Sequence, residues 1–68
     1  MLRELFENVA PYISNLWEIK KFVEENEDKS TEEIIEEIER RIDGSEGTLK
    51  TDYRILLNEL EKTINNRM

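Results

Sequence analysis

The sequence predicts an all-α fold, a small bundle of three helices. Three segments place their apolar residues at steps of three and four, the spacing of one face of an α-helix. No segment alternates apolar and polar residues as a half-buried strand does. The connections between the segments are short, which favours antiparallel neighbours. We expect helices at residues 2–26, 31–43 and 48–65 of a single domain, 1–68.

The first helix has the broadest apolar surface of the three. Its seam follows a seven-residue repeat, and adjacent apolar positions widen the stripe to about half of the circumference. One neighbouring helix does not cover such an arc, so we expect two later helices, or one helix and a second subunit, to contact it. The seam consists of Leu2, Leu5, Val9, Tyr12, Leu16, Ile19 and Val23.

Pro11 interrupts this first helix. Proline cannot donate a hydrogen bond to the carbonyl of Glu7, so it either kinks the helix or begins a new one. Ala10 is a poor N-cap for a new helix, and the seam keeps its phase across the proline. We therefore prefer one kinked helix over residues 2–26. The alternative is a short helix followed by a longer one, which would make four helices in all.

The second helix begins with a clear capping signal. Ser30 followed three residues later by Glu33 is a capping box, and it precedes a narrow stripe of isoleucines. Arg40 and Arg41 lie in the last turn, where the helix dipole favours cations. The apolar stripe consists of Ile34, Ile35, Ile38 and Ile42.

The third helix follows a turn at residues 43–47, which contains two glycines. Its apolar residues again fall at helical spacing and predict one face packed against the other helices. These residues are Leu49, Tyr53, Leu56, Leu57, Leu60 and Ile64.

The composition excludes several kinds of chemistry. The chain has no cysteine and no histidine, so disulfides, a structural zinc site and nucleophile systems built on histidine are all ruled out. We therefore expect a non-enzymatic protein without a cofactor or a metal. The first residues include Glu4 and Glu7 and do not resemble a signal peptide. No apolar run reaches the length of a membrane span, so a cytoplasmic location is expected.

Negative charge is concentrated in the middle of the chain. Of the net charge of −7, residues 24–46 carry eleven acidic and three basic side chains, a balance of −8. Such negative charge disfavours binding to nucleic acids and to anionic membranes. It favours binding to a protein partner with a basic surface. The candidate contact residues are Glu32, Glu33, Glu36 and Glu37. The alternative is that these glutamates only form the solvated face of their helix.

Two aromatic side chains are candidate anchors for a protein partner. Trp17 lies at the edge of the apolar arc of the first helix, and Phe22 projects outside that arc if the helix is regular. Aromatic residues often dominate the binding energy of protein interfaces. The alternative for Phe22 is a packing contact within the protein.

The segment Ser-Glu-Gly-Thr-Leu-Lys at residues 45–50 resembles the turn and recognition-helix start of helix-turn-helix proteins related to sigma factors. The preceding helix resembles their positioning helix. This resemblance covers about a quarter of the chain and implies DNA binding through Thr48, Lys50, Thr51 and Arg54. The chain departs from the family pattern at Glu39, which stands where these families have a small residue.

Two pairs of acidic residues suggest a further alternative. Glu4-x-x-Glu7 and Glu25-x-x-Asp28 are similar to the motifs with which all-α nucleotide pyrophosphatases hold Mg²⁺. In a chain so rich in acidic residues, such pairs also arise by chance. Our preferred function is a protein–protein interaction module, in one version a small acidic regulator or inhibitor of a nucleic-acid-handling protein. A homodimer through the first helix is a further expectation.

Overall fold

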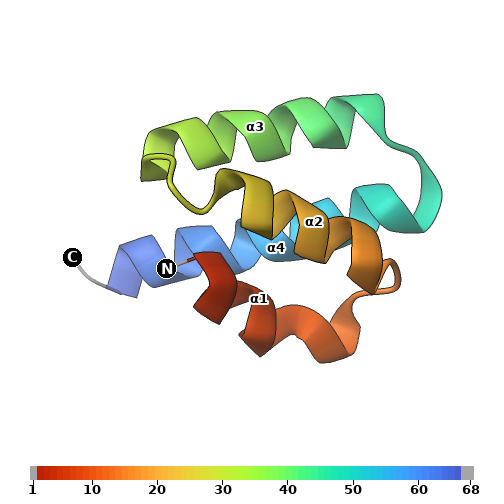
Figure 1. Ribbon diagram of the computed structural model, residues 1–68, viewed down its shortest axis with the longest axis horizontal. Helices are drawn as coiled ribbons and strands as arrows, with labels where there is room; N and C mark the ends of the chain where they lie inside the picture. Colours follow the sequence, from red (N-terminus) through yellow and green to blue (C-terminus); the bar gives the residue numbers. More distant parts are fainter. Residues whose placement is uncertain (1, 67–68) are drawn as a thin grey trace.

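The computed structural model describes residues 2–66, and within this range it contains four α-helices and no strand. Successive helices run in opposite directions, so that α3 and α4 form one antiparallel pair and α1 and α2 another (Figure 1). The all-α fold predicted from the sequence is confirmed. The elements are α1 (Leu2–Val9), a 3₁₀ turn (Ala10–Tyr12), α2 (Leu16–Asn26), α3 (Thr31–Gly44) and α4 (Gly47–Asn66).

The first predicted helix is broken at Pro11. The chain leaves the α-helix after Val9, forms a 3₁₀ turn that carries Pro11 in its first positions, and is extended at Ile13 before α2 begins. Our preference for one kinked helix over residues 2–26 is therefore wrong, and the four-helix alternative is confirmed. At the start of a turn the missing N–H of proline costs no hydrogen bond, so Pro11 is well placed there.

A carboxylate from α4 stabilises the new helix start. Asp52 is only 1% exposed. Its oxygens accept hydrogen bonds from the backbone N–H groups of Ser14 and Asn15 at 2.9 and 2.8 Å, and from the side-chain amide of Asn15 at 2.8 Å. The side chain of Asn15 also donates to the hydroxyl of Thr48 at 3.1 Å. Asp52 thus supplies the N-terminal cap that the residues before α2 lack.

The helices α3 and α4 follow the sequence prediction closely. The capping box of α3 is present: the hydroxyl of Ser30 accepts from the backbone N–H of Glu33 at 3.3 Å, and the Ser30 N–H donates to the Glu33 carboxylate at 3.2 Å. Gly47, which has a φ of 63°, allows the short connection between α3 and α4 because glycine adopts this left-handed conformation without steric cost. Both helices end within about two residues of their predicted limits, which is ordinary precision for helix termini.

The core is built from all four helices and from the connection after Pro11. Phe22 of α2 meets Tyr53 of α4 edge to face, with ring centroids 5.4 Å apart. The predicted first seam does not stay buried: Tyr12 and Leu16 lie on the surface, since the seam turns outward where the helix breaks. The buried apolar residues are Leu2, Leu5, Val9, Ile13, Ile19, Phe22, Val23, Ile34, Ile38, Tyr53, Leu56 and Leu60.

Candidate functional site

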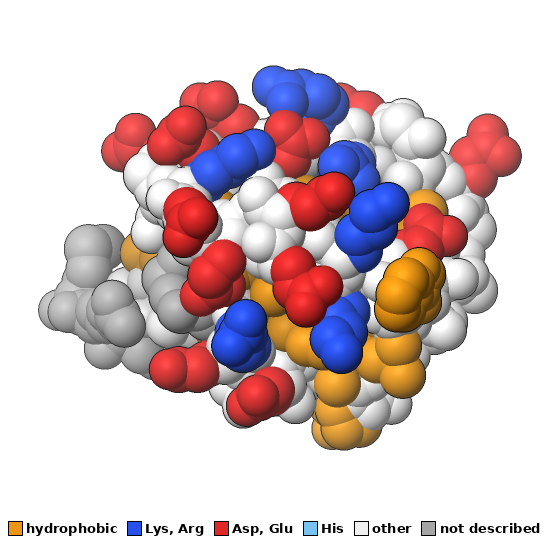
Figure 2. Space-filling view, viewed as in Figure 1, with side chains coloured by type: hydrophobic (Ala, Val, Ile, Leu, Met, Phe, Trp, Pro, Cys, Tyr) orange, Lys and Arg blue, Asp and Glu red, His pale blue; other side chains and the backbone are white. Residues whose placement is uncertain are grey.

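Three large apolar side chains lie exposed at the corner between α1 and α2. Tyr12 is 72% exposed, Leu16 48% and Trp17 78%. We call these three residues the apolar corner. Figure 2 shows hydrophobic side chains gathered at one corner of the molecule, whereas acidic and basic side chains are spread over the rest of this face. Clustered exposed aromatic residues are typical of protein interaction sites.

The break at Pro11 creates the apolar corner. Tyr12 ends the 3₁₀ turn, and Leu16 and Trp17 form the first turn of α2. The buried face of α2 begins only at Ile19, so the side chains of Leu16 and Trp17 point away from the core. Because Asp52 holds Ser14 and Asn15 between these exposed residues, the corner is presented on an anchored segment of backbone.

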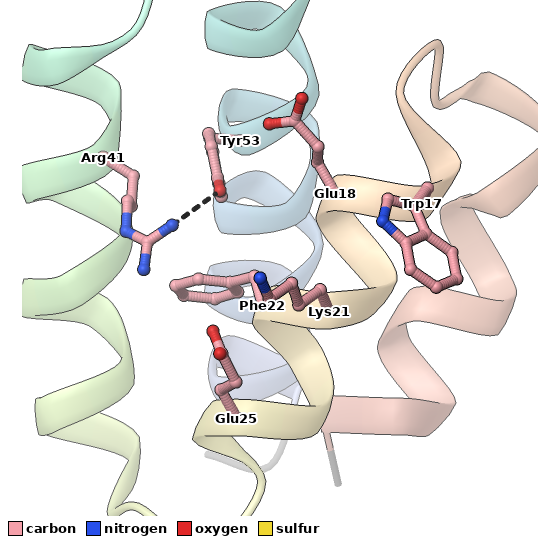
Figure 3. A pocket seen from close by; sticks show the side chains of 7 residues that line it. All are labelled: Trp17, Glu18, Lys21, Phe22, Glu25, Arg41 and Tyr53. Atoms are coloured by element: carbon pink, nitrogen blue, oxygen red, sulfur yellow. Dashed lines mark hydrogen bonds between the residues drawn. The ribbon is translucent and has the colours of Figure 1, made fainter.

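Phe22, the second predicted anchor, belongs to the core. It is 1% exposed, and the guanidinium carbon of Arg41 lies 5.3 Å from the centre of its ring. The alternative for Phe22, a packing contact within the protein, is confirmed: the first helix is not regular, and α2 is a separate helix whose buried face contains position 22. Phe22 is therefore not an exposed anchor beside Trp17, whose indole ring points to the side of α2 away from Arg41 (Figure 3).

A groove of about 500 Å³ runs between α2 and α3 over the side chain of Tyr53. Arg41 reaches into it from α3 and donates from Nη1 to the hydroxyl of Tyr53 at 3.2 Å (Figure 3). The sequence places Arg41 in the last turn of its helix, and no local signal marks its contact with α2 and α4. The groove is lined by Trp17, Glu18, Lys21, Phe22, Glu25, Arg41 and Tyr53.

Two of the four candidate glutamates on α3 are engaged within the protein. The hydrogen bond from the Ser30 backbone N–H holds the pKa of Glu33 below its ordinary value. Glu37, whose side chain is 18% exposed, pairs with Arg40 at 2.6 Å and with Arg41 at 3.4 Å. Glu32, Glu33 and Glu36 are exposed, but the Glu33 carboxylate is held by the start of its own helix. The acidic face offered to a partner is therefore narrower than the sequence suggests.

Two observations bear on the metal-binding and helix-turn-helix alternatives. Among residues 2–66, no three or more acidic side chains are grouped so that they could hold a metal ion. The acidic motifs lie on α1 (Glu4, Glu7) and at the end of α2 (Glu25, Asp28). The helices α3 and α4 run antiparallel (Figure 1), whereas the two helices of a helix-turn-helix cross at about 90–120°.

The chain was compared with known proteins and protein families. No helix within residues 2–66 is both long enough and apolar enough to cross a membrane. No curated protein and no solved structure matches the chain. A family model described as the MJ1579 family matches residues 1–65, nearly the whole sequence. The chain therefore belongs to the MJ1579 family.

Proposed function

We propose that this protein is a non-enzymatic interaction module that binds another protein through the apolar corner. The observation that carries the proposal is the exposure of Trp17, 78%, beside Tyr12 and Leu16. Tryptophan and tyrosine are enriched among the residues that dominate binding energy at interfaces. A chain with so few large apolar residues gains stability by burying them, so three left outside together indicate a surface used for contact.

The apolar corner is large enough to drive association. Since an aromatic side chain buries about 150–250 Å² when fully covered, the exposed parts of the corner amount to on the order of 400 Å². At about 25 cal/mol per Å², covering them contributes about 10 kcal/mol before the costs of association. Those costs are about 4–15 kcal/mol, so the corner supports a moderate affinity when polar contacts surround it.

The acidic surface of α3 adds selectivity in this proposal. Glu32 and Glu36 are exposed, and complementary charge speeds encounter with a basic partner more than it raises affinity. A regulator or inhibitor of a nucleic-acid-handling protein is one version, since such proteins carry basic surfaces. This version is the less direct one, because Glu33 and Glu37 are engaged within the protein itself.

Affinity capture from a native extract tests the proposal. The wild-type protein should retain a partner that Trp17→Ala loses, whereas Arg54→Ala, which removes a long exposed side chain from α4, should retain it. The partner is then identified, purified and titrated against each variant, and Trp17→Ala should raise the dissociation constant at least tenfold. Equal retention and equal affinity for all three proteins would refute the apolar corner as the binding site.

A further inference from the structure

We infer that the partner of the apolar corner is a second copy of this chain, with Trp17 of each copy seated in the groove between α1 and α2 of the other. This inference rests on the proposed function and names the occupant of the same site. It follows from a groove that lies beside the corner, from the distribution of charge, and from the area that such a contact buries.

The groove between α1 and α2 has an apolar floor. It has a volume of about 500 Å³, which lies within the usual range of ligand sites, about 300–1,000 Å³. Val23 is buried, and Phe6 is partly exposed and packs against the core. The groove is lined by Arg3, Phe6, Glu7, Lys20, Val23 and Glu24.

Trp17 and this groove lie next to each other on the same pair of helices. Lys20, which lines the groove, follows Trp17 by three residues, about one turn of α2. The indole points toward α1 rather than toward Arg41 (Figure 3). The hydrophobic surface of the corner continues inward between charged side chains (Figure 2).

A two-fold contact uses both features at once. In such an interface the same surface serves both copies, so a projecting side chain and a groove on one face can engage reciprocally. If no groove lay beside Trp17, the Trp17 side chains of the two copies would have no complementary surface to enter. The arrangement of Trp17 beside the groove therefore fits a second copy.

The charge around this groove permits self-association in spite of the net charge of the molecule. Each copy has a net charge of −7, so two copies repel at long range. The rim of the groove, however, is balanced, with Arg3 and Lys20 against Glu7 and Glu24. Contact through α1 and α2 brings this neutral rim together and keeps the acidic α3 helices, on the other side of α2 from α1 in Figure 1, away from the interface.

The area is that of a small but specific dimer. The apolar corner contributes on the order of 400 Å², and the groove that it covers contributes on the order of 100 Å² on the other copy. Counting both reciprocal contacts, the dimer buries on the order of 1,000 Å², which is the lower limit for a specific interface. We expect a dissociation constant in the micromolar range. Added salt should lower it, because salt screens the net repulsion between the two copies.

Light scattering and fluorescence on the full chain test this inference. The scattering mass should rise from 8.2 kDa toward twice that value as the concentration increases from about 1 μM to about 1 mM. Trp17 is the sole tryptophan, so its emission should shift to shorter wavelength over the same range. Trp17→Ala should raise the dissociation constant at least tenfold, and Arg54→Ala should leave it unchanged.

Mixing two defective variants tests the reciprocal arrangement. Glu24→Tyr places a ring at the rim of the groove, whereas Trp17→Ala removes the side chain that enters it. Each variant alone should dimerise at least tenfold more weakly than the wild type. An equimolar mixture should recover part of the association, since the Trp17 of the Glu24→Tyr copy still meets the intact groove of the Trp17→Ala copy, which restores one of the two reciprocal contacts. Absence of recovery in the mixture would overturn the seating of Trp17 in the groove.

A mass that stays monomeric at every concentration, with unchanged emission, would overturn the second copy as partner. The proposed function would then be judged separately, by capture of a different protein that depends on Trp17. The two failures are thus distinguishable.

Discussion

Replacing Asp52 by asparagine should destabilise the protein strongly, although the two side chains have nearly the same shape. In the wild type, the two carboxylate oxygens accept from two backbone N–H groups, of Ser14 and Asn15, and from the Asn15 amide, at 2.8–2.9 Å. Asparagine offers one oxygen and one NH₂ group. At least one N–H at the start of α2 then faces a group that cannot accept from it.

The magnitude follows from these contacts. A hydrogen bond to a charged group contributes about 1.5–3 kcal/mol, and a buried unpaired donor costs a similar amount. Losing one such bond and weakening the others should lower the free energy of unfolding by about 2–4 kcal/mol. A chain of 68 residues has a total stability of about 3–10 kcal/mol, so the variant should lose a large part of it.

Urea unfolding measures this effect, followed by the circular dichroism of the helices. Asp43→Asn is the matched control, because it makes the same chemical change at an exposed position of α3. If Asp52→Asn shifts the free energy of unfolding by no more than about 0.5 kcal/mol, the size of an ordinary surface substitution, the capping argument is refuted.

Four further predictions concern the cap of α3, its contacts and its pairing with α4. Ser30→Ala should lower the free energy of unfolding by about 1 kcal/mol, the usual cost of losing an N-cap, as measured in urea. Because the pKa of Glu33 is lowered from 4.5, its contribution should be complete above that value and lost as the pH falls through the lower native pKa; wild type and Glu33→Gln should therefore converge in acid. Arg41→Met should cost about 1–2 kcal/mol, since it removes the hydrogen bond to Tyr53 and the cation–π contact with Phe22, and an unchanged unfolding midpoint would contradict this. A mixed-sequence DNA duplex at low salt should show no binding in the micromolar range, by fluorescence anisotropy, because the protein is acidic and α3 and α4 are antiparallel.

The helices α3 and α4 were predictable because their determinants are local. Ser30 and Glu33 stand three residues apart, and the capping box that they form needs no other part of the chain. The isoleucine stripe of α3 and the leucine stripe of α4 repeat at the helical period, so each sequence marks its own buried face. The structure buries Ile38 and Leu60 completely, at positions that the periodicity indicates.

The region around Pro11 was not predictable in the same way. The apolar seam kept its helical phase across the proline, and the residues before α2 offered no strong cap, so the local evidence favoured one continuous helix. The decisive partner of Ser14 and Asn15 is Asp52, which lies 37 residues or more further along the chain. A similar contact stabilises α1, where the backbone N–H of Arg3 donates to the carboxylate of Glu27 at 3.0 Å.

The sequence by itself determined the all-α class, the limits of α3 and α4 and the concentration of acidic residues in the middle of the chain. Periodicity and adjacent capping residues act over one or two helical turns, so they can be read without knowledge of the partner helices. Only the tertiary structure decided where α2 begins, that Phe22 is buried, and that Tyr12, Leu16 and Trp17 are left outside. Each of these outcomes depends on which remote side chain meets the backbone, and that is settled only when the helices pack.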